Sequence, residues 1–162
     1  ILITDSERVA NAVGEEIEVQ LAQLPRKEIA GTSLQQAGKI ILAKDMPTVI
    51  EMANLSAPEH LEIMTKAPFE IMPYIRNAGA MFLGAYSPEP LGDYYAGPNH
   101  VLPTGGTAKF YSVLNVETFM KKTSIIAYTA PALLAAADGI ITLAEAEGLQ
   151  AHANAIRKRV GK

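Results

Sequence analysis

The sequence contains no cysteine. This absence excludes disulfide bonds, thiolate metal sites and cysteine nucleophiles. Any bound metal ion must therefore take nitrogen and oxygen ligands, supplied by histidine and carboxylate side chains. Because the chain has only three histidines, the positions that can contribute such chemistry are few.

An excess of positive charge and a long apolar segment are missing as well. The net charge is −3 and the only basic cluster lies at residues 157–159, which argues against a nucleic-acid-binding surface. The longest apolar stretch, residues 128–141, is interrupted by Pro131 and Asp138 and does not predict a membrane span. No basic segment precedes an apolar one at the start of the sequence, so we expect a cytoplasmic protein.

Short signatures of nucleotide and metal binding are also absent. No GxGxxG, GxxxxGK[ST] or HExxH pattern occurs, and Gly105-Gly106 follows a loop rather than a strand. The sequence therefore indicates no position for a dinucleotide.

What the sequence does contain is ample apolar material, since 49% of its residues are hydrophobic and 19% are charged. Nearly continuous apolar runs alternate with helical patterns, which is typical of strands buried on both faces of a parallel sheet. The helical patterns begin at capping residues, Ser6 or Asp5 in the first and Asp45 before Pro47 in a later one. The four predicted strands are Ile1–Thr4, Lys39–Ala43, His60–Met64 and Ala80–Gly84.

The pattern changes after the fourth strand. Residues 85–106 are rich in Gly and Pro and have no helical or strand period, as in a long functional loop or a disordered one. We therefore predict an α/β fold, a Rossmann-like parallel sheet flanked by helices, over residues 1–114. A small all-helical C-terminal domain is predicted to follow over residues 115–162. Its helical patterns cover Val116 to Lys121, Thr129 to about Glu147, and a last segment through His152 to Val160.

Glu59 and His60 follow Pro58 at the start of the third predicted strand. A histidine beside a carboxylate in irregular backbone is a candidate for proton transfer or metal binding, because imidazole titrates closest to neutrality. Neighbours in a regular strand point to opposite faces, so both side chains can share a pocket only where the pleat is not yet established. The alternative is a strand-edge glutamate beside a half-buried structural histidine.

Asp93 and His100 lie in the Gly/Pro-rich segment, and α/β folds bind ligands in loops after parallel strands. Asp93 is a candidate metal ligand or a turn residue that bonds its own backbone. His100 is a candidate site residue or a structural hydrogen-bonding histidine. Glu147 and His152 are five positions apart, so they share no helix face unless Gly148 bends the chain, and a surface role is their alternative.

These segments resemble histidinol dehydrogenase, and the resemblance covers essentially all 162 residues. The order and spacing of the motifs are similar to the second half of that family. The most specific motifs are Pro58-Glu59-His60-Leu61, residues 78–84 (AGAMFLG), 86–89 (YSPE), 92–94 (GDY), 99–104 (NHVLPT) and 151–155 (AHANA).

The resemblance implies a catalytic pair, Glu59 and His60, and one Zn2+ per site with Asp93 and His152 among its ligands. The implied reaction oxidises L-histidinol to L-histidine through an enzyme-held aldehyde, with two NAD-dependent steps, as the last step of histidine biosynthesis. A homodimer with each site shared between its subunits is also implied. The residues implied to meet the substrate are His60, Asp93, His100, Glu147 and His152.

The family's other two zinc ligands, a Gln and a His, and most of its nicotinamide-binding surface are expected upstream of residue 1. Since two protein ligands make a poor zinc site, we expect this chain to be a fragment that is inactive alone. Two alternatives stay open. One is a non-catalytic dimerisation or ligand-binding module of the same fold. The other is a metal-dependent hydrolase with Glu59 as base and His100 as a third ligand.

Overall fold

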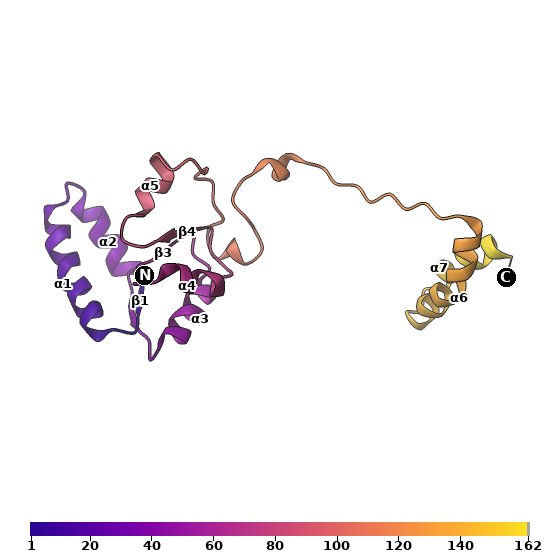
Figure 1. The fold of residues 1–162 in the computed structure, drawn as a ribbon, viewed down its shortest axis with the longest axis horizontal. Coiled ribbons are helices and arrows are strands. Elements are labelled where there is room, and N and C mark those ends of the chain that lie inside the picture. The colour runs from indigo at the N-terminus through magenta and orange to yellow at the C-terminus, as the bar shows by residue number, and fades with distance from the viewer. Residues whose placement is uncertain (162) are drawn as a thin grey trace. The chain divides into compact units, whose positions relative to one another are not determined.

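The computed structural model describes residues 1–161 and divides the chain into two compact units (Figure 1). The first unit is Ile1–Phe119 and the second begins at Met120. In the described part of the chain, the first unit holds every strand and the second holds two long helices. None of the described helices is long and apolar enough to cross a membrane.

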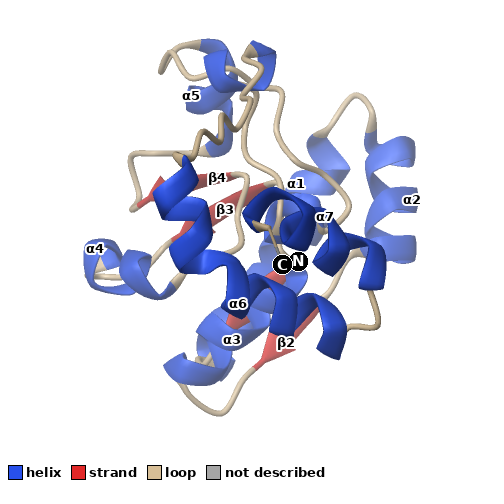
Figure 2. Ribbon diagram, turned by 90° about the vertical axis from the view of Figure 1, so that its right-hand side faces the viewer, coloured by secondary structure: helices blue, strands red, loops and turns tan. Residues whose placement is uncertain are grey.

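The first unit alternates strands and helices, as the sequence predicts. Its strands are drawn in red in Figure 2. In chain order the elements are β1 (Leu2–Thr4), α1 (Glu7–Gln23), α2 (Lys27–Ala37), β2 (Ile40–Leu42), α3 (Met46–Ser56), β3 (His60–Ile63), α4 (Pro68–Ile71), a 3-10 turn (Met72–Tyr74), β4 (Ala80–Leu83) and α5 (Glu89–Tyr94).

The strands are parallel, which confirms that prediction, but they form two pairs rather than one sheet. β1 pairs with β2 and β3 pairs with β4, so that His60 lies opposite Ala80 and Glu62 opposite Phe82. The expectation that every strand is buried on both faces is wrong for β2, where Ile40 is 42% and Leu42 53% exposed. A strand of three residues with a single neighbour leaves its other edge and part of its faces uncovered.

Capping residues start α1 and α3 where the sequence predicts. The Ser6 hydroxyl accepts from the Val9 backbone N–H at 3.3 Å, and this bond begins α1. The Asp45 carboxylate accepts from the backbone N–H of Thr48 at 2.9 Å and from its hydroxyl at 2.5 Å, and these bonds begin α3. Both caps use a side-chain oxygen to satisfy N–H groups that have no partner inside the helix.

The end of α3 fixes the approach to β3. Ala57 is fully buried and has a positive φ of 44°, which turns the chain out of the helix directly before Pro58. Asn54, also buried, accepts from the backbone N–H groups of Arg76 at 2.6 Å and Asn77 at 3.2 Å and donates to the Tyr74 carbonyl at 2.9 Å. One amide side chain thus ties the segment before β3 to the segment before β4.

The prediction that residues 85–106 lack regular structure is wrong in part, because the segment contains α5. Between α5 and residue 130 the described chain forms only short 3-10 turns, at Thr107–Lys109 and Val116–Phe119. The second of these turns occupies part of the short helix expected over residues 116–121. Tertiary contacts from β3 and β4, described below, explain why a helix forms in so Gly- and Pro-rich a sequence.

The second unit is a helical hairpin of α6 (Ala130–Ala146) and α7 (Gln150–Val160). Thr129 caps α6, as predicted, through its hydroxyl and the Ala132 N–H. Gly148, with a φ of 75°, separates the two helices. Small side chains allow the helices to pack closely, and the buried residues of this core are Ile141, Ala144 and Ala153.

Candidate active site

One face of the β3–β4 pair carries the chemically informative side chains. His60 and Glu62 are two positions apart in β3, so both point to the same face. Phe82 lies opposite Glu62 in the parallel register and shares that face. Its ring lies 5.9 Å from the His60 ring, measured between centroids, and its side chain is buried. The histidine therefore has an apolar wall on one side.

α5 brings two carboxylates to the same place. Glu89 and Asp93 are four positions apart, and this spacing puts them on one side of the helix. The His60 Nε2 atom lies 3.6 Å from a Glu89 carboxylate oxygen and 3.9 Å from an Asp93 carboxylate oxygen. The three groups form the His60–Glu89–Asp93 cluster, in which one ligand atom from each residue lies within 4.8 Å of the others.

The cluster is only partly open to solvent. The side chains of His60, Glu89 and Asp93 are 27%, 35% and 31% exposed. The His60 Nε2 atom itself is buried and makes no hydrogen bond. Its distances to the two carboxylates exceed those of a good N–H···O bond, so this nitrogen faces two acidic oxygens without a close partner.

The Glu89 and Asp93 carboxylates lie close together, and this makes it less favourable for both to be charged. Burial, followed by a hydrogen bond with Asp93 and the Asp93 charge, raises the pKa of the Glu89 carboxyl above its usual value of 4.5, and the nearby His60 opposes the shift. A proton or a cation between the carboxylates relieves this repulsion.

The donor set fits a divalent metal ion such as zinc. The cluster offers one imidazole nitrogen and carboxylate oxygens from two side chains, which are the ligand types left to a cysteine-free zinc site. The unbonded His60 nitrogen and the unfavourable pair of carboxylates are both features that a cation at this position would satisfy.

The structure does not bring every predicted site residue into this cluster. Glu59 lies directly before β3 and is half-buried, but it is not one of the three grouped residues. His100 is exposed in the segment after α5 and is also outside the cluster, so the hydrolase alternative gains no third ligand from it. Glu147 and His152 are exposed residues of the second unit, on either side of Gly148. That glycine does bend the chain, so the regular-helix spacing does not apply to them.

A cavity of about 380 Å³ adjoins the cluster. Asp93 lines both, so a molecule in the cavity would lie beside the carboxylate. The walls are mainly apolar, with a few polar groups that can orient a ligand. Its lining comes from β4, α5 and the following segment and includes Phe82, Leu91, Asp93, Asn99 and Leu102.

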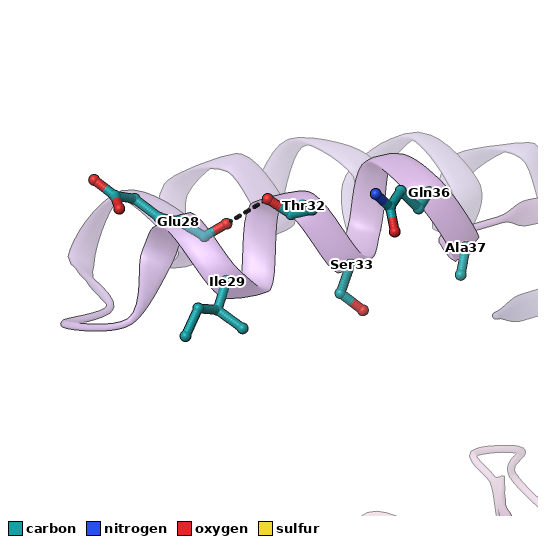
Figure 3. Close-up of a pocket in the computed structure, with 6 residues that line it drawn as sticks. All are labelled: Glu28, Ile29, Thr32, Ser33, Gln36 and Ala37. Carbon is teal, nitrogen blue, oxygen red and sulfur yellow. Dashed lines mark hydrogen bonds between the residues drawn. The ribbon is translucent and has the colours of Figure 1, made fainter.

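A second hollow lies on α2 and has no comparable chemistry. Figure 3 shows that all of its labelled side chains come from this one helix, with the Thr32 hydroxyl bonded to the Glu28 carbonyl. It contains no histidine and a single carboxylate, that of Glu28. The His60–Glu89–Asp93 cluster is therefore the better candidate for an active site.

Comparison with known proteins identifies the family. The family model described as histidinol dehydrogenase matches residues 1–160. The chain belongs to the histidinol dehydrogenase family. It is 57% identical over 162 residues to histidinol dehydrogenase of Heliobacterium mobile and 52% identical to that of Sulfurimonas denitrificans, covering the whole of this chain and 38% of each relative. The match falls in the C-terminal part of the relatives. The chain spans well under half of their length.

A solved structure agrees with this assignment. The crystal structure of histidinol dehydrogenase from Elizabethkingia anophelis matches with a TM-score of 0.79 and 38% sequence identity, over 99% of this chain and 37% of that one. The α/β fold with a helical C-terminal part is thus that of a histidinol dehydrogenase.

Within this histidinol dehydrogenase family member, sequence reasoning missed Glu89 as a site residue. The local signal was present. Pro90 in the first helical turn and the four-residue spacing of Glu89 and Asp93 both favour a helix with two carboxylates on one side. The abundance of Gly and Pro in residues 85–106 concealed it.

Proposed function

We propose that this chain is part of a zinc- and NAD-dependent histidinol dehydrogenase that oxidises L-histidinol to L-histidine through the aldehyde. The single observation that carries the proposal is the cluster of His60 with Asp93 and Glu89 in a member of this family. A half-buried imidazole can exchange protons, and a carboxylate beside it can help to hold a cation, as alcohol oxidation at such a site requires.

The proposed chemistry has two oxidations with a hydration between them. The alcohol carbon loses a hydride and its hydroxyl loses a proton, which gives the aldehyde. Water adds to the aldehyde, and the hydrate then loses a second hydride and a second proton to give the acid. Two NAD+ molecules are consumed, and the nicotinamide of each accepts one hydride.

His60 is the proposed base for the alcohol proton. Its Nε2 atom makes no hydrogen bond, so a bond to a substrate hydroxyl would displace no existing partner, and Phe82 restricts the ring on one side. Glu59 is the proposed base for the water that hydrates the aldehyde. Because Glu59 directly precedes β3, its side chain is not held to the face opposite His60 by a regular pleat.

Asp93 and His152 are the proposed metal ligands in this chain. A zinc ion held by them would bind and orient nitrogen and oxygen groups of the substrate. His100 and Glu147 are proposed to contact the substrate together with His60, Asp93 and His152. A homodimer with shared sites is part of the proposal, and the cytoplasmic location stays a prediction.

The test is an assay of the protein expressed from its complete reading frame with L-histidinol and NAD. Two NADH for each L-histidine formed are expected, and His60→Ala should lower kcat about 10²–10⁴-fold, the usual contribution of general base catalysis. Glu70→Ala, a change of an exposed glutamate on α4, is the control and should leave kcat unchanged. Binding of L-histidinol without NADH formation would instead favour the non-catalytic module.

The isolated 162-residue chain is predicted to form no NADH. The physical reason is that two proposed protein ligands are too few for a stable zinc site. NADH formation by the purified 162-residue chain would contradict this part of the proposal.

A further inference from the structure

We propose that Glu62 is a positioning residue for this site: its carboxylate anchors the first residue of α5 and thereby keeps Asp93 and Glu89 against His60. The inference rests on the proposed function for its catalytic consequences, but the anchoring itself is a property of the fold.

α5 cannot be stable through its own sequence. It has only six residues, and isolated helices shorter than about 12 residues are marginal even with favourable sequences. Its N-cap is Pro88, which offers no side-chain acceptor, and it contains a second proline and a glycine. Contacts with the rest of the first unit must therefore hold it in place.

The first turn of α5 has one N–H group that needs an acceptor from outside the helix. Pro90 has no N–H, and the Leu91 N–H donates to the Pro88 carbonyl at 3.0 Å. The Glu89 N–H donates to the Glu62 carboxylate at 2.8 Å. A charged acceptor makes this a stronger bond than one between neutral groups.

The anchor and the imidazole come from the same strand face. Glu62 and His60 are two positions apart in β3, while Glu89 and Asp93 are four positions apart in α5. The hydrogen bond from the Glu89 N–H to Glu62 therefore fixes the start of α5 on β3, and this helps to position the Asp93 carboxylate near His60. In this arrangement an Asp93 carboxylate oxygen lies 3.9 Å from the His60 Nε2 atom.

Attraction between side-chain charges does not explain this contact. Glu62, Glu89 and Asp93 all carry carboxylates, and the Glu62 charge opposes ionisation of Glu89. The favourable interaction is the backbone bond alone. A glutamine at position 62 keeps an oxygen acceptor of the same reach and removes the repulsion, whereas an alanine removes the anchor.

Glu62 is not proposed to bind the metal. The described residues that could hold a cation together are His60, Glu89 and Asp93, and Glu62 is outside that group. Its action is through the backbone of α5, as for outer-shell residues that orient metal ligands.

The experiment compares Glu62→Ala, Glu62→Gln and the control Glu70→Ala in the protein from the complete reading frame. The readouts are Zn2+ affinity, kcat for L-histidinol, and amide hydrogen exchange of residues 89–94. Glu62→Ala should weaken Zn2+ binding or activity about 10–100-fold, the usual effect of losing an outer-shell partner, and should speed exchange in α5. Glu62→Gln keeps the acceptor and removes the repulsion from Glu89, so all three readouts should lie nearer to wild type than to Glu62→Ala, and Glu70→Ala should change none.

Two results would overturn the proposal. One is wild-type exchange of residues 89–94 in Glu62→Ala. The other is a loss in Glu62→Gln as large as in Glu62→Ala, which would show that the charge rather than the hydrogen bond is needed. If the wild-type protein neither binds Zn2+ nor oxidises L-histidinol, the proposed function fails. The exchange of α5 still tests the anchor in that case.

Discussion

Gly92 of α5 lies against the ring of Phe82 in β4. A Cβ atom at position 92 would be 2.7 Å from Phe82 Cε1 and 2.9 Å from Cζ, closer than real Cβ contacts. Phe82 is buried and stands beside His60, so its ring has little room to move. The absence of a side chain at Gly92 therefore lets α5 approach the β3–β4 face closely enough for Asp93 to reach His60.

Gly92→Ala is accordingly expected to destabilise the protein by about 1–3 kcal/mol, the usual cost of overpacking. The added methyl group pushes α5 away from Phe82, so kcat should fall as well. Denaturant unfolding and the histidinol assay measure the two effects. The control is Gly139→Ala in α6, where a Cβ meets nothing within 4 Å and alanine should stabilise the helix by about 0.5–1 kcal/mol. Equal stability of Gly92→Ala and wild type would contradict the close packing.

Asn54→Ala is expected to lower the free energy of unfolding by about 1–3 kcal/mol for each buried group left unbonded. The side chain of Asn54 satisfies the Arg76 and Asn77 N–H groups and the Tyr74 carbonyl, and water cannot easily replace a buried amide. Denaturant unfolding measures the loss. Asn11→Ala, at an exposed position of α1, should change stability by less than about 0.5 kcal/mol. Similar losses of stability in Asn54→Ala and Asn11→Ala would show that the hydrogen bonds of the Asn54 side chain do not stabilise the fold.

Asp45 makes stability depend on pH. Hydrogen bonds from the Thr48 hydroxyl and the Thr48 N–H hold the pKa of the Asp45 carboxyl below its usual value of 3.8. Because the folded pKa is depressed, the stabilising contribution is complete above the unfolded pKa and is lost as pH falls through the folded pKa. Asp45→Asn keeps a cap but cannot titrate in this range. The stability of wild type relative to Asp45→Asn should therefore fall on acidification below about pH 4. A difference that stays constant from pH 7 to pH 2 would contradict the assignment.

Local sequence signals predicted most of the secondary structure. Ser6, Asp45 and Thr129 begin helices because each has a side-chain oxygen that accepts from the N–H group three positions on, and that information is entirely local. The four parallel strands were likewise visible as short apolar runs. Their division into two pairs was not visible, since pairing depends on which edges meet in space.

The candidate site shows the same limit. The sequence singled out His60 and Asp93 individually, and the structure brings them together. The sequence did not indicate that Glu89 joins them. α5 depends on contacts with residues earlier in the chain. Glu62 bonds Glu89 from 27 positions away, and Phe82 packs against Gly92 from 10 positions away. Proline suits the first turn of α5, but a helix of six residues with a glycine inside it is too short to be stable alone, so tertiary contacts explain why it forms.

The central claim is that the carboxylates of α5 and the imidazole of His60 belong to a cation-binding active site. Calorimetric titration of Zn2+ into the metal-stripped protein from the complete reading frame, and into its Asp93→Asn variant, tests this most directly. Loss of an outer-shell residue usually weakens metal binding about 10–100-fold. Because Asp93 is proposed to be a direct ligand, the account predicts that Asp93→Asn weakens Zn2+ binding by at least that factor. Equal Zn2+ affinities of the wild-type and Asp93→Asn proteins would contradict it.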